Sequence, residues 1–201
     1  MIKNVIFDFG NVICRFDPEA MARNFCENDE DAKLLADTLF EPVVWEEMDK
    51  GFVDMETYGK EMIPQLPERL HKSAENLLRN WFYHIPEIDG MRELLIKLKE
   101  KGIKLYILSN ICNQFADHYQ VIDIFKLFDG LVFSCTINCI KPNDGIYLHL
   151  IEKYTLNKTE CVFVDDRKIN IEAAIKLDIE GYIFDGDVQK LEQYLFDVIN
   201  H

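Results

Sequence analysis

The chain has 201 residues, of which 48% are hydrophobic, and a formal net charge of −14 at pH 7. This length favours one core domain with a modest insertion. Its negative charge argues against nucleic acid or an anionic membrane as a partner, and no apolar run approaches the ~20 residues that cross a bilayer.

The first predicted element is a short buried strand, Lys3–Asp8, which ends on a carboxylate. The stretch that follows, residues 16–85, has helical patterns and no strand pattern. Asp17, followed by a proline, is typical of a helix start, and Asp54 can cap another helix. One apolar stripe at helical spacing consists of Leu70, Ala74, Leu77, Leu78 and Trp81. We therefore predict an all-helical insertion that forms a cap over the core.

From residue 86 onward, helical and strand patterns alternate. The strand patterns lie at residues 104–109, 130–133, 161–165 and 181–184. Several are apolar on both faces, as parallel strands covered by helices on both sides must be. This alternation predicts an α/β fold with a doubly wound parallel sheet. Residues 1–15 and 86–201 would form this core, and residues 16–85 the helical cap.

The start of the chain and its cysteines predict the compartment. Met1–Asn4 has neither the basic flank nor the cleavage site of a signal peptide, so the cytoplasm is the expected location. The six cysteines form no Cys-x-x-Cys pair. We expect most of them to act as small hydrophobic residues rather than as metal ligands.

Polar side chains stand at the carboxyl ends of the predicted strands, where open α/β sheets bind their ligands. These residues are Asp8, Ser109, Asn110, Asp165 and Asp166, with Lys141 in the loop after the third strand. A nucleophile candidate, a hydroxyl, a cation and an acidic pair would therefore meet in a single crevice.

The charges of these side chains suggest a phosphate-ester reaction. A carboxylate such as Asp8 can attack phosphorus and form an acyl phosphate. Because two anions repel each other, a divalent cation must lie between them, and Asp8 with Asp166 offers the oxygens that Mg²⁺ prefers. Ser109 can hold a phosphoryl oxygen, and Lys141 can offset its charge. The sequence therefore predicts a Mg²⁺-dependent phosphatase that acts on a small phosphorylated substrate.

Four motifs occur in order along the chain: Asp8-Phe9-Gly10-Asn11-Val12, Leu108-Ser109-Asn110, Lys141-Pro142, and the segment 164–174 that begins Val164-Asp165-Asp166. With these motifs the chain resembles the haloacid dehalogenase superfamily of phosphatases. The resemblance spans the whole chain, because the helical insertion falls where that superfamily has its type-one cap.

The resemblance implies a role for each matching position. The implied Mg²⁺ ligands are Asp8, which is also the nucleophile, Asp166, and Gly10 through its carbonyl oxygen. The residues implied to hold the metal's waters are Asp165 and Asn170. The residues implied to bind the phosphoryl group are Ser109, Asn110 and Lys141.

Gly10 is a departure from the superfamily pattern, which usually has a second Asp at this position as general acid and base. The Asp-x-Gly-Asn-Val form resembles a bacterial branch that includes sugar-1-phosphate phosphatases, which favours a sugar phosphate as the substrate. Without a proton donor at this position, kcat/KM should fall as the leaving-group pKa rises, unless water, Asn11 or a cap acid such as Glu47 replaces the missing Asp. The cap residues that can face the site from a predicted turn before Gly51 are Trp45, Glu46, Glu47 and Asp49.

Two alternatives remain open at this point. A metal-free dehalogenase of the same superfamily would not need the acidic pair Asp165-Asp166. A regulatory protein without catalytic activity would explain Gly10. Nothing in the sequence indicates an oligomeric state.

Overall fold

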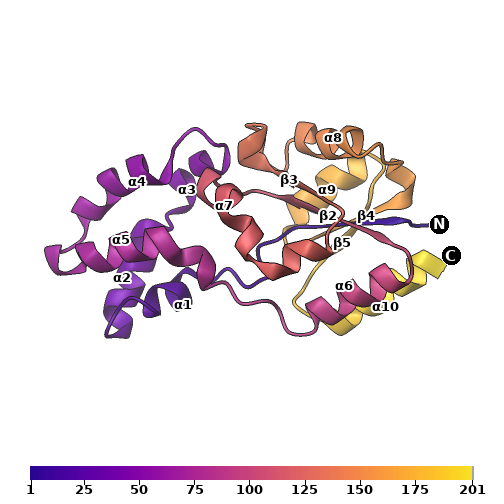
Figure 1. Cartoon of the computed structure of the whole chain (residues 1–201). Helices are drawn as coiled ribbons and strands as arrows, with labels where there is room; N and C mark the ends of the chain where they lie inside the picture. The colour runs from indigo at the N-terminus through magenta and orange to yellow at the C-terminus, as the bar shows by residue number, and fades with distance from the viewer. Residues whose placement is uncertain (201) are drawn as a thin grey trace.

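The computed structural model describes residues 1–200, which form two lobes (Figure 1). One lobe is built on a sheet of five parallel strands, and the other contains only helices. The strands, in their order across the sheet, are β3 (Gly130–Phe133), β2 (Lys104–Ser109), β1 (Asn4–Phe7), β4 (Cys161–Asp165) and β5 (Glu180–Ile183). The predicted parallel sheet is confirmed. The first strand is one residue shorter at each end than expected, and the last strand begins and ends one residue earlier.

Helices cover both faces of the sheet (Figure 1). They are α6 (Met91–Glu100) and α10 (Val188–Asn200) on one face, and α8 (Asp144–Lys153) and α9 (Lys168–Lys176) on the other. Successive side chains of a strand point to opposite faces. In β1, Val5 and Phe7 accordingly pack in one hydrophobic core and Ile6 in the other. All four residues of β1 are therefore buried.

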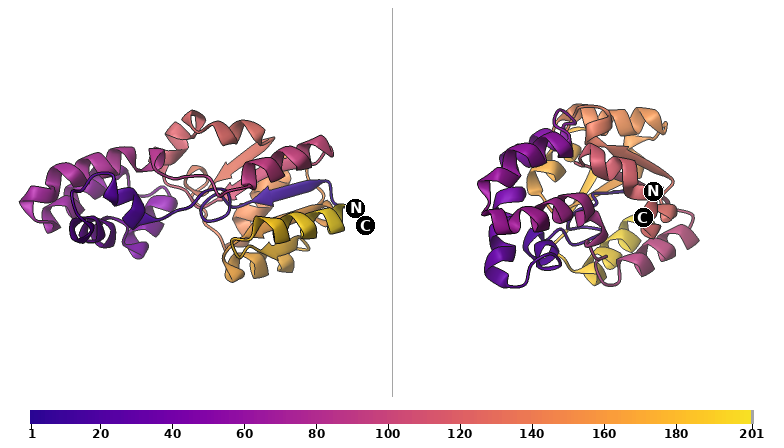
Figure 2. Two further views of the ribbon diagram at one scale, coloured as in Figure 1. Left: turned by 90° about the horizontal axis from the view of Figure 1, so that it is seen from below. Right: turned by 60° about the vertical axis from the view of Figure 1, so that its left-hand side comes forward.

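The helical lobe, as we call residues 16–85, extends to one side of the sheet (Figure 2). Its helices are α1 (Pro18–Arg23), α2 (Asp29–Leu39), α3 (Pro42–Asp49), α4 (Met55–Met62) and α5 (His71–Asn80), joined in part by short 3₁₀ turns. Asp17 and Asp54 cap α1 and α4 as predicted, since their carboxylates accept hydrogen bonds from backbone amides three residues on, at 3.0 and 2.8 Å. Within residues 1–200, no helix is long and apolar enough to cross a membrane.

The helix α3 corrects the sequence-based prediction of a turn before Gly51. Pro42 occupies the first position of this helix, and the Glu41 side chain accepts a hydrogen bond from the Val44 amide at 3.0 Å. A proline at the first position and a side-chain acceptor before it both favour a helix start. The segment is therefore helical up to Asp49.

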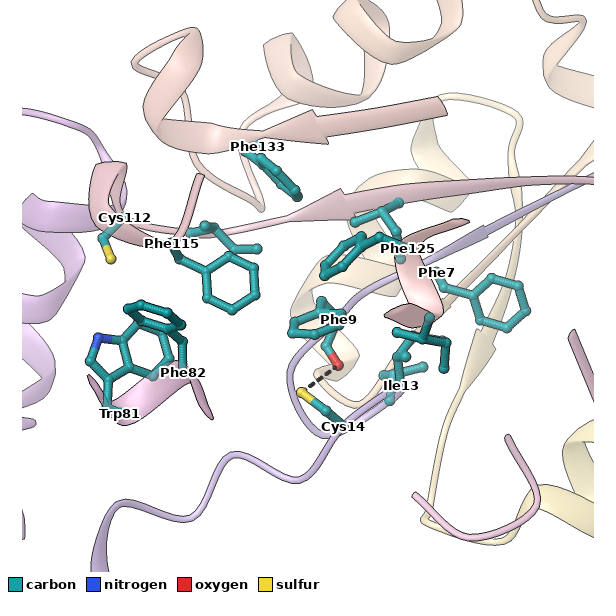
Figure 3. Close-up of a cluster of buried hydrophobic side chains, with 14 of the residues drawn as sticks. Phe7, Phe9, Ile13, Cys14, Trp81, Phe82, Cys112, Phe115, Phe125 and Phe133 are labelled. Atoms are coloured by element: carbon teal, nitrogen blue, oxygen red, sulfur yellow. Dashed lines mark hydrogen bonds between the residues drawn. The ribbon is translucent and has the colours of Figure 1, made fainter. Parts of the chain in front are cut away.

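Aromatic side chains join the two lobes near the end of β1 (Figure 3). The ring of Phe9 stacks on Phe125, with centroids 4.7 Å apart, and lies 5.3 Å from Phe115 in α7 (Asn113–His118). On its other side, Phe115 stacks on Trp81 of the helical lobe at 5.6 Å. The Trp81 indole also donates a hydrogen bond to the Gln114 side chain at 2.9 Å. The hydrophobic core thus continues from the sheet into the helical lobe.

Candidate active site

Asp8 lies at the centre of the sheet edge where the strands end. Its backbone amide donates to the Val164 carbonyl of β4 at 2.9 Å, which extends the pairing of the two strands by one residue. From β2, the Ser109 hydroxyl donates to Asp8 Oδ1 at 2.6 Å. Because neighbouring parallel strands end at the same edge, residues 101 positions apart become direct partners, as predicted from the strand ends.

Lys141 lies directly behind Asp8. Its ammonium group is 2.8 Å from Asp8 Oδ1 and 2.7 Å from Asp165 Oδ2, and its side chain is only 1% exposed. Burial by itself would lower the pKa of Lys141, but the two carboxylates outweigh burial and the pKa is raised. The lysine is therefore charged and bridges the ends of β1 and β4.

The side chain of Asn110 positions this lysine. Its Oδ1 accepts a hydrogen bond from the Lys141 amide at 2.8 Å, and its Nδ2 donates to the Lys141 carbonyl at 3.2 Å. The loop that carries Lys141 is thereby attached to the end of β2. One amide hydrogen of Asn110 remains for a ligand.

Asp165 uses both carboxylate oxygens within the protein. Besides Lys141, it accepts hydrogen bonds from the Arg167 amide at 2.8 Å and from Asn170 Nδ2 at 2.9 and 3.0 Å. Asn170 Oδ1 is buried and has no hydrogen-bond partner among residues 1–200. These contacts leave Asp165 fully buried.

The third carboxylate, Asp166, completes a cluster that can hold a cation. Oxygens of Asp8, Asp165 and Asp166 lie within 4.8 Å of one another. Burial raises the pKa of Asp8 to about 6, although Lys141 opposes the shift. Burial and the charge of Asp165 raise the pKa of Asp166 as well. Three carboxyl groups thus share one lysine, which leaves a negative charge that a divalent cation would neutralise.

The free oxygens of this cluster fit such a cation. Among residues 1–200, no other residue donates a hydrogen bond to Asp8 Oδ2, to the Gly10 carbonyl oxygen or to the Asp166 carboxylate, which accepts only from its own backbone amide. Mg²⁺ prefers a few carboxylate or carbonyl oxygens and keeps several waters. The donor set therefore suits Mg²⁺, with Asp165 too occupied to be a direct ligand.

A cavity of about 190 Å³ lies over these residues, between the two lobes. The predicted site residues that line this cavity are Asp8, Gly10, Ser109, Asn110 and Asp166. The predicted residues Lys141, Asp165 and Asn170 lie behind its wall. Arg167 also lines the cavity, a residue that we did not single out although it lies in the fourth motif. A larger groove of about 600 Å³ on the helical lobe contains none of the predicted residues.

The helical lobe contributes two of its four candidate residues to this cavity. Trp45 and Asp49 line it, one helical turn apart on the same face of α3. Glu46 and Glu47 instead pair with Lys50, at 2.9 and 2.8 Å, and do not line the cavity. The expectation that Glu47 can serve the site is therefore wrong, because a helix turns residues 46 and 47 away from the face that carries 45 and 49.

Known proteins resemble this chain over most of its length. The family model described as haloacid dehalogenase-like hydrolase matches residues 28–183. A D-ribitol-5-phosphate phosphatase from Bacteroides thetaiotaomicron is 25% identical over 193 residues, which covers 90% of this chain and 91% of the relative. Flavin mononucleotide hydrolase 1 from Arabidopsis thaliana is 26% identical over 149 residues, or 72% of this chain, and the match spans only 58% of that longer protein.

A solved structure supports the fold. The HAD-family enzyme from Bacteroides thetaiotaomicron, in complex with magnesium and inorganic phosphate, matches with a TM-score of 0.71 at 20% identity, covering 90% of this chain and 93% of that one. The match of the family model to more than half of the chain confirms the predicted superfamily and the prediction of a hydrolytic enzyme. The chain belongs to the haloacid dehalogenase-like hydrolase family.

Proposed function

We propose that this protein is a Mg²⁺-dependent phosphomonoesterase that acts on a small phosphorylated metabolite through phosphorylation of Asp8. The observation that carries the proposal is the position of Asp8 in the cavity wall, where Ser109 and Lys141 contact one oxygen and the carboxylate lies within 4.8 Å of those of Asp165 and Asp166. In this proposal the helical lobe, residues 16–85, is the cap, and residues 1–15 and 86–201 are the catalytic core.

The reaction would proceed in two displacements at phosphorus. An oxygen of the Asp8 carboxylate attacks phosphorus, the bond from phosphorus to the leaving oxygen breaks, and that oxygen takes up a proton. Water then attacks the phosphorylated Asp8, gives up a proton, and releases inorganic phosphate with the carboxylate restored. Ser109 and the free amide hydrogen of Asn110 hold the phosphoryl oxygens in this arrangement. Lys141 orients Asp8 and offsets negative charge as phosphorus approaches.

The metal site follows from the oxygens that the protein leaves unused. Bound Mg²⁺ would supply positive charge next to the Asp8 carboxylate, so that an anionic phosphoryl group can approach it. We assign Asp8, the Gly10 carbonyl and Asp166 as its direct ligands. Asp165 and Asn170 lie behind them, and the unpartnered Asn170 Oδ1 can accept a hydrogen bond from a metal-bound water.

The cavity walls favour a small organic group on the phosphate. Aromatic rings of Phe16, Trp45 and Trp81 line the side formed by the helical lobe, and a volume of about 190 Å³ admits one small metabolite. Aromatic faces bind the carbon faces of sugars as well as planar groups. The relative from Bacteroides thetaiotaomicron that acts on D-ribitol 5-phosphate makes a sugar or polyol phosphate the favoured class.

The test is a screen of phosphorylated metabolites with Mg²⁺, run in parallel on the wild type and on Asp8→Asn. The wild type should release phosphate from at least one sugar or polyol phosphate, and the variant should lose nearly all turnover while keeping its fold. Retention of more than a tenth of the activity would exclude Asp8 as the nucleophile, since tenfold is only about 1.4 kcal/mol of barrier. Chelator-resistant turnover of 2-haloacids would instead support the metal-free dehalogenase.

A further inference from the structure

Asp49 is an acid in the cavity that the reaction described above does not use. The carboxyl groups that line the cavity belong to Asp8, Asp49 and Asp166. Asp8 and Asp166 belong to the nucleophile and the metal cluster on the sheet. Asp49 comes from the helical lobe, at the last position of α3, and its carboxylate makes no hydrogen bond or ion pair within residues 1–200. A partly buried carboxyl group without a protein partner is costly unless a ligand uses it.

Three side chains of the sheet lobe hold the backbone around Asp49. The Ser134 hydroxyl donates to the Asp49 carbonyl at 2.6 Å. The amides of Asn138 and Asn113 donate to the next two carbonyls, of Lys50 at 2.7 Å and Gly51 at 3.3 Å. Three consecutive carbonyls are thus bound to the segments that follow β2 and β3. These contacts fix the position of the Asp49 backbone relative to the sheet edge that carries Asp8.

Gly51 makes this close approach possible. Its φ is +80°, and a Cβ on it would lie 2.7 Å from the Cys135 carbonyl oxygen. Any other residue would therefore push the segment 49–51 away from the sheet lobe. Backbone and side-chain contacts together hold Asp49 at a defined place over the site.

On the sheet lobe, position 10 of the cavity lining carries no side chain. A Cβ on Gly10 would meet only Phe16, at 3.9 Å, and the φ of Gly10 lies outside the left-handed region. The cavity therefore has room at the position where an acidic side chain next to the nucleophile would stand. Among the other polar side chains of the lining, the amides Asn11 and Asn110 and the guanidinium Arg167 are poor proton donors, and burial raises the pKa of the thiols of Cys14 and Cys112.

We propose that Asp49 gives the proton to the leaving oxygen when Asp8 attacks phosphorus, and later takes one from the water that cleaves the phosphorylated Asp8. This role rests on the proposed phosphatase function. The protons balance: the one that Asp49 loses in the first displacement is regained in the second. Attack and departure are in line, so the leaving oxygen lies on the far side of phosphorus from Asp8, where a donor carried by the other lobe can reach it.

Burial supports this assignment, because it raises the pKa of Asp49 to about 7, with the charge of Asp8 adding to the shift. A group with such a pKa exists in both protonation states near neutral pH, as a donor that must also act as an acceptor requires. The titratable and charged groups that act on Asp49 are Asp8, Lys141 and Glu46, and it acts in turn on the thiols of Cys112 and Cys135.

The test compares Asp49→Asn with the wild type on two substrates, an aryl phosphate with an acidic leaving group and an alkyl phosphate with a basic one. The variant should lose 10²–10⁴-fold in kcat/KM on the alkyl phosphate and less than about tenfold on the aryl phosphate, because only the basic leaving oxygen needs the proton. Glu47→Gln, two residues away in α3 but outside the cavity, is the matched control and should retain both activities. A similar loss on both substrates, or none on either, would refute the role of Asp49.

Two further measurements keep the test decisive. Asp49→Asn should accumulate phosphorylated Asp8 during turnover of the aryl phosphate, visible by intact mass after an acid quench, because its hydrolysis lacks a base. In the same background, Gly10→Asp should restore much of the lost rate on the alkyl phosphate, since the cavity has room for the new carboxyl. Failure of both would overturn the proposal. If instead Asp8→Asn retained activity, the proposed mechanism through phosphorylation of Asp8 would itself be refuted.

Discussion

The ammonium group of Lys141 lies 2.8 Å from Asp8 and is almost completely buried against it. The same nitrogen is 2.7 Å from Asp165, so one lysine compensates two buried carboxylates. An arrangement of this kind is costly to disrupt from one side, because the remaining charges stay buried without a partner. Lys141 therefore affects both stability and the chemistry at Asp8.

Lys141→Met should lower the free energy of unfolding by about 3–5 kcal/mol, since it retains most of the side-chain volume but leaves two carboxylates uncompensated. Thermal or urea unfolding at pH 7 measures the loss. Lys168→Met is the control, because its exposed pair with Glu172 at 3.4 Å should contribute less than about 1 kcal/mol. Equal effects of the two substitutions would show that Lys141 does not act as the shared counter-charge.

Asp166→Ala should weaken Mg²⁺ binding by at least about tenfold more than Asp165→Ala, because only Asp166 has free oxygens for the metal. Calorimetric titration of each folded variant with Mg²⁺ measures the affinities. Asp185→Ala, which removes an exposed partner of Lys190, should bind Mg²⁺ as the wild type does. A larger effect of Asp165→Ala would reverse our assignment of direct and indirect roles.

Asp49→Asn should raise the melting temperature, and by more at pH 8 than at pH 5. In the folded protein the Asp49 pKa is raised from 3.8 to about 7, so the native state binds more protons than the unfolded chain between these values. The stability of the wild type must then fall as the pH rises through this window, whereas Asn does not titrate. In a chain of this length each kcal/mol amounts to about 2–4 °C.

Scanning calorimetry with chelator present makes this comparison without interference from Mg²⁺. Glu47→Gln is again the control, since the loss of its surface pair with Lys50 should change the melting temperature little at either pH. If Asp49→Asn raised the melting temperature by the same amount at both pH values, the result would contradict the raised pKa of Asp49.

Gly51→Ala should reduce kcat/KM on alkyl phosphates, because the new methyl group must displace the segment that holds Asp49. Gly102→Ala is a matched control: its φ is +79°, close to the +80° of Gly51, but a Cβ there meets nothing within 4 Å. Both variants should lose about 1–2 kcal/mol of stability to left-handed backbone strain. Only Gly51→Ala should also lose activity, and an equal loss in Gly102→Ala would rule out a positional effect.

The sequence alone was sufficient to predict the sheet and the residues that lie at its edge. Strands buried on both faces appear as short apolar runs, and β2 (Lys104–Ser109) and β4 (Cys161–Asp165) begin and end where those runs do. Because neighbouring parallel strands end at one edge, the positions at the carboxyl ends of these runs, including Asp8 and Ser109, had to converge. The contacts of Asn110 with Lys141 could not be read in this way, since they depend on a loop conformation.

Only the tertiary structure decided what the helical lobe contributes to the site. The sequence offered Glu47 and Asp49 as equivalent acids before Gly51, and their difference comes from two facts of packing. The segment is a helix, which turns Glu47 toward Lys50 and Asp49 toward the cavity. Side chains far away in the chain, Ser134 among them, then hold the end of that helix over Asp8. The periodicity of hydrophobic residues indicates which side of an element is buried. The surface against which that side packs depends on contacts between segments distant in sequence.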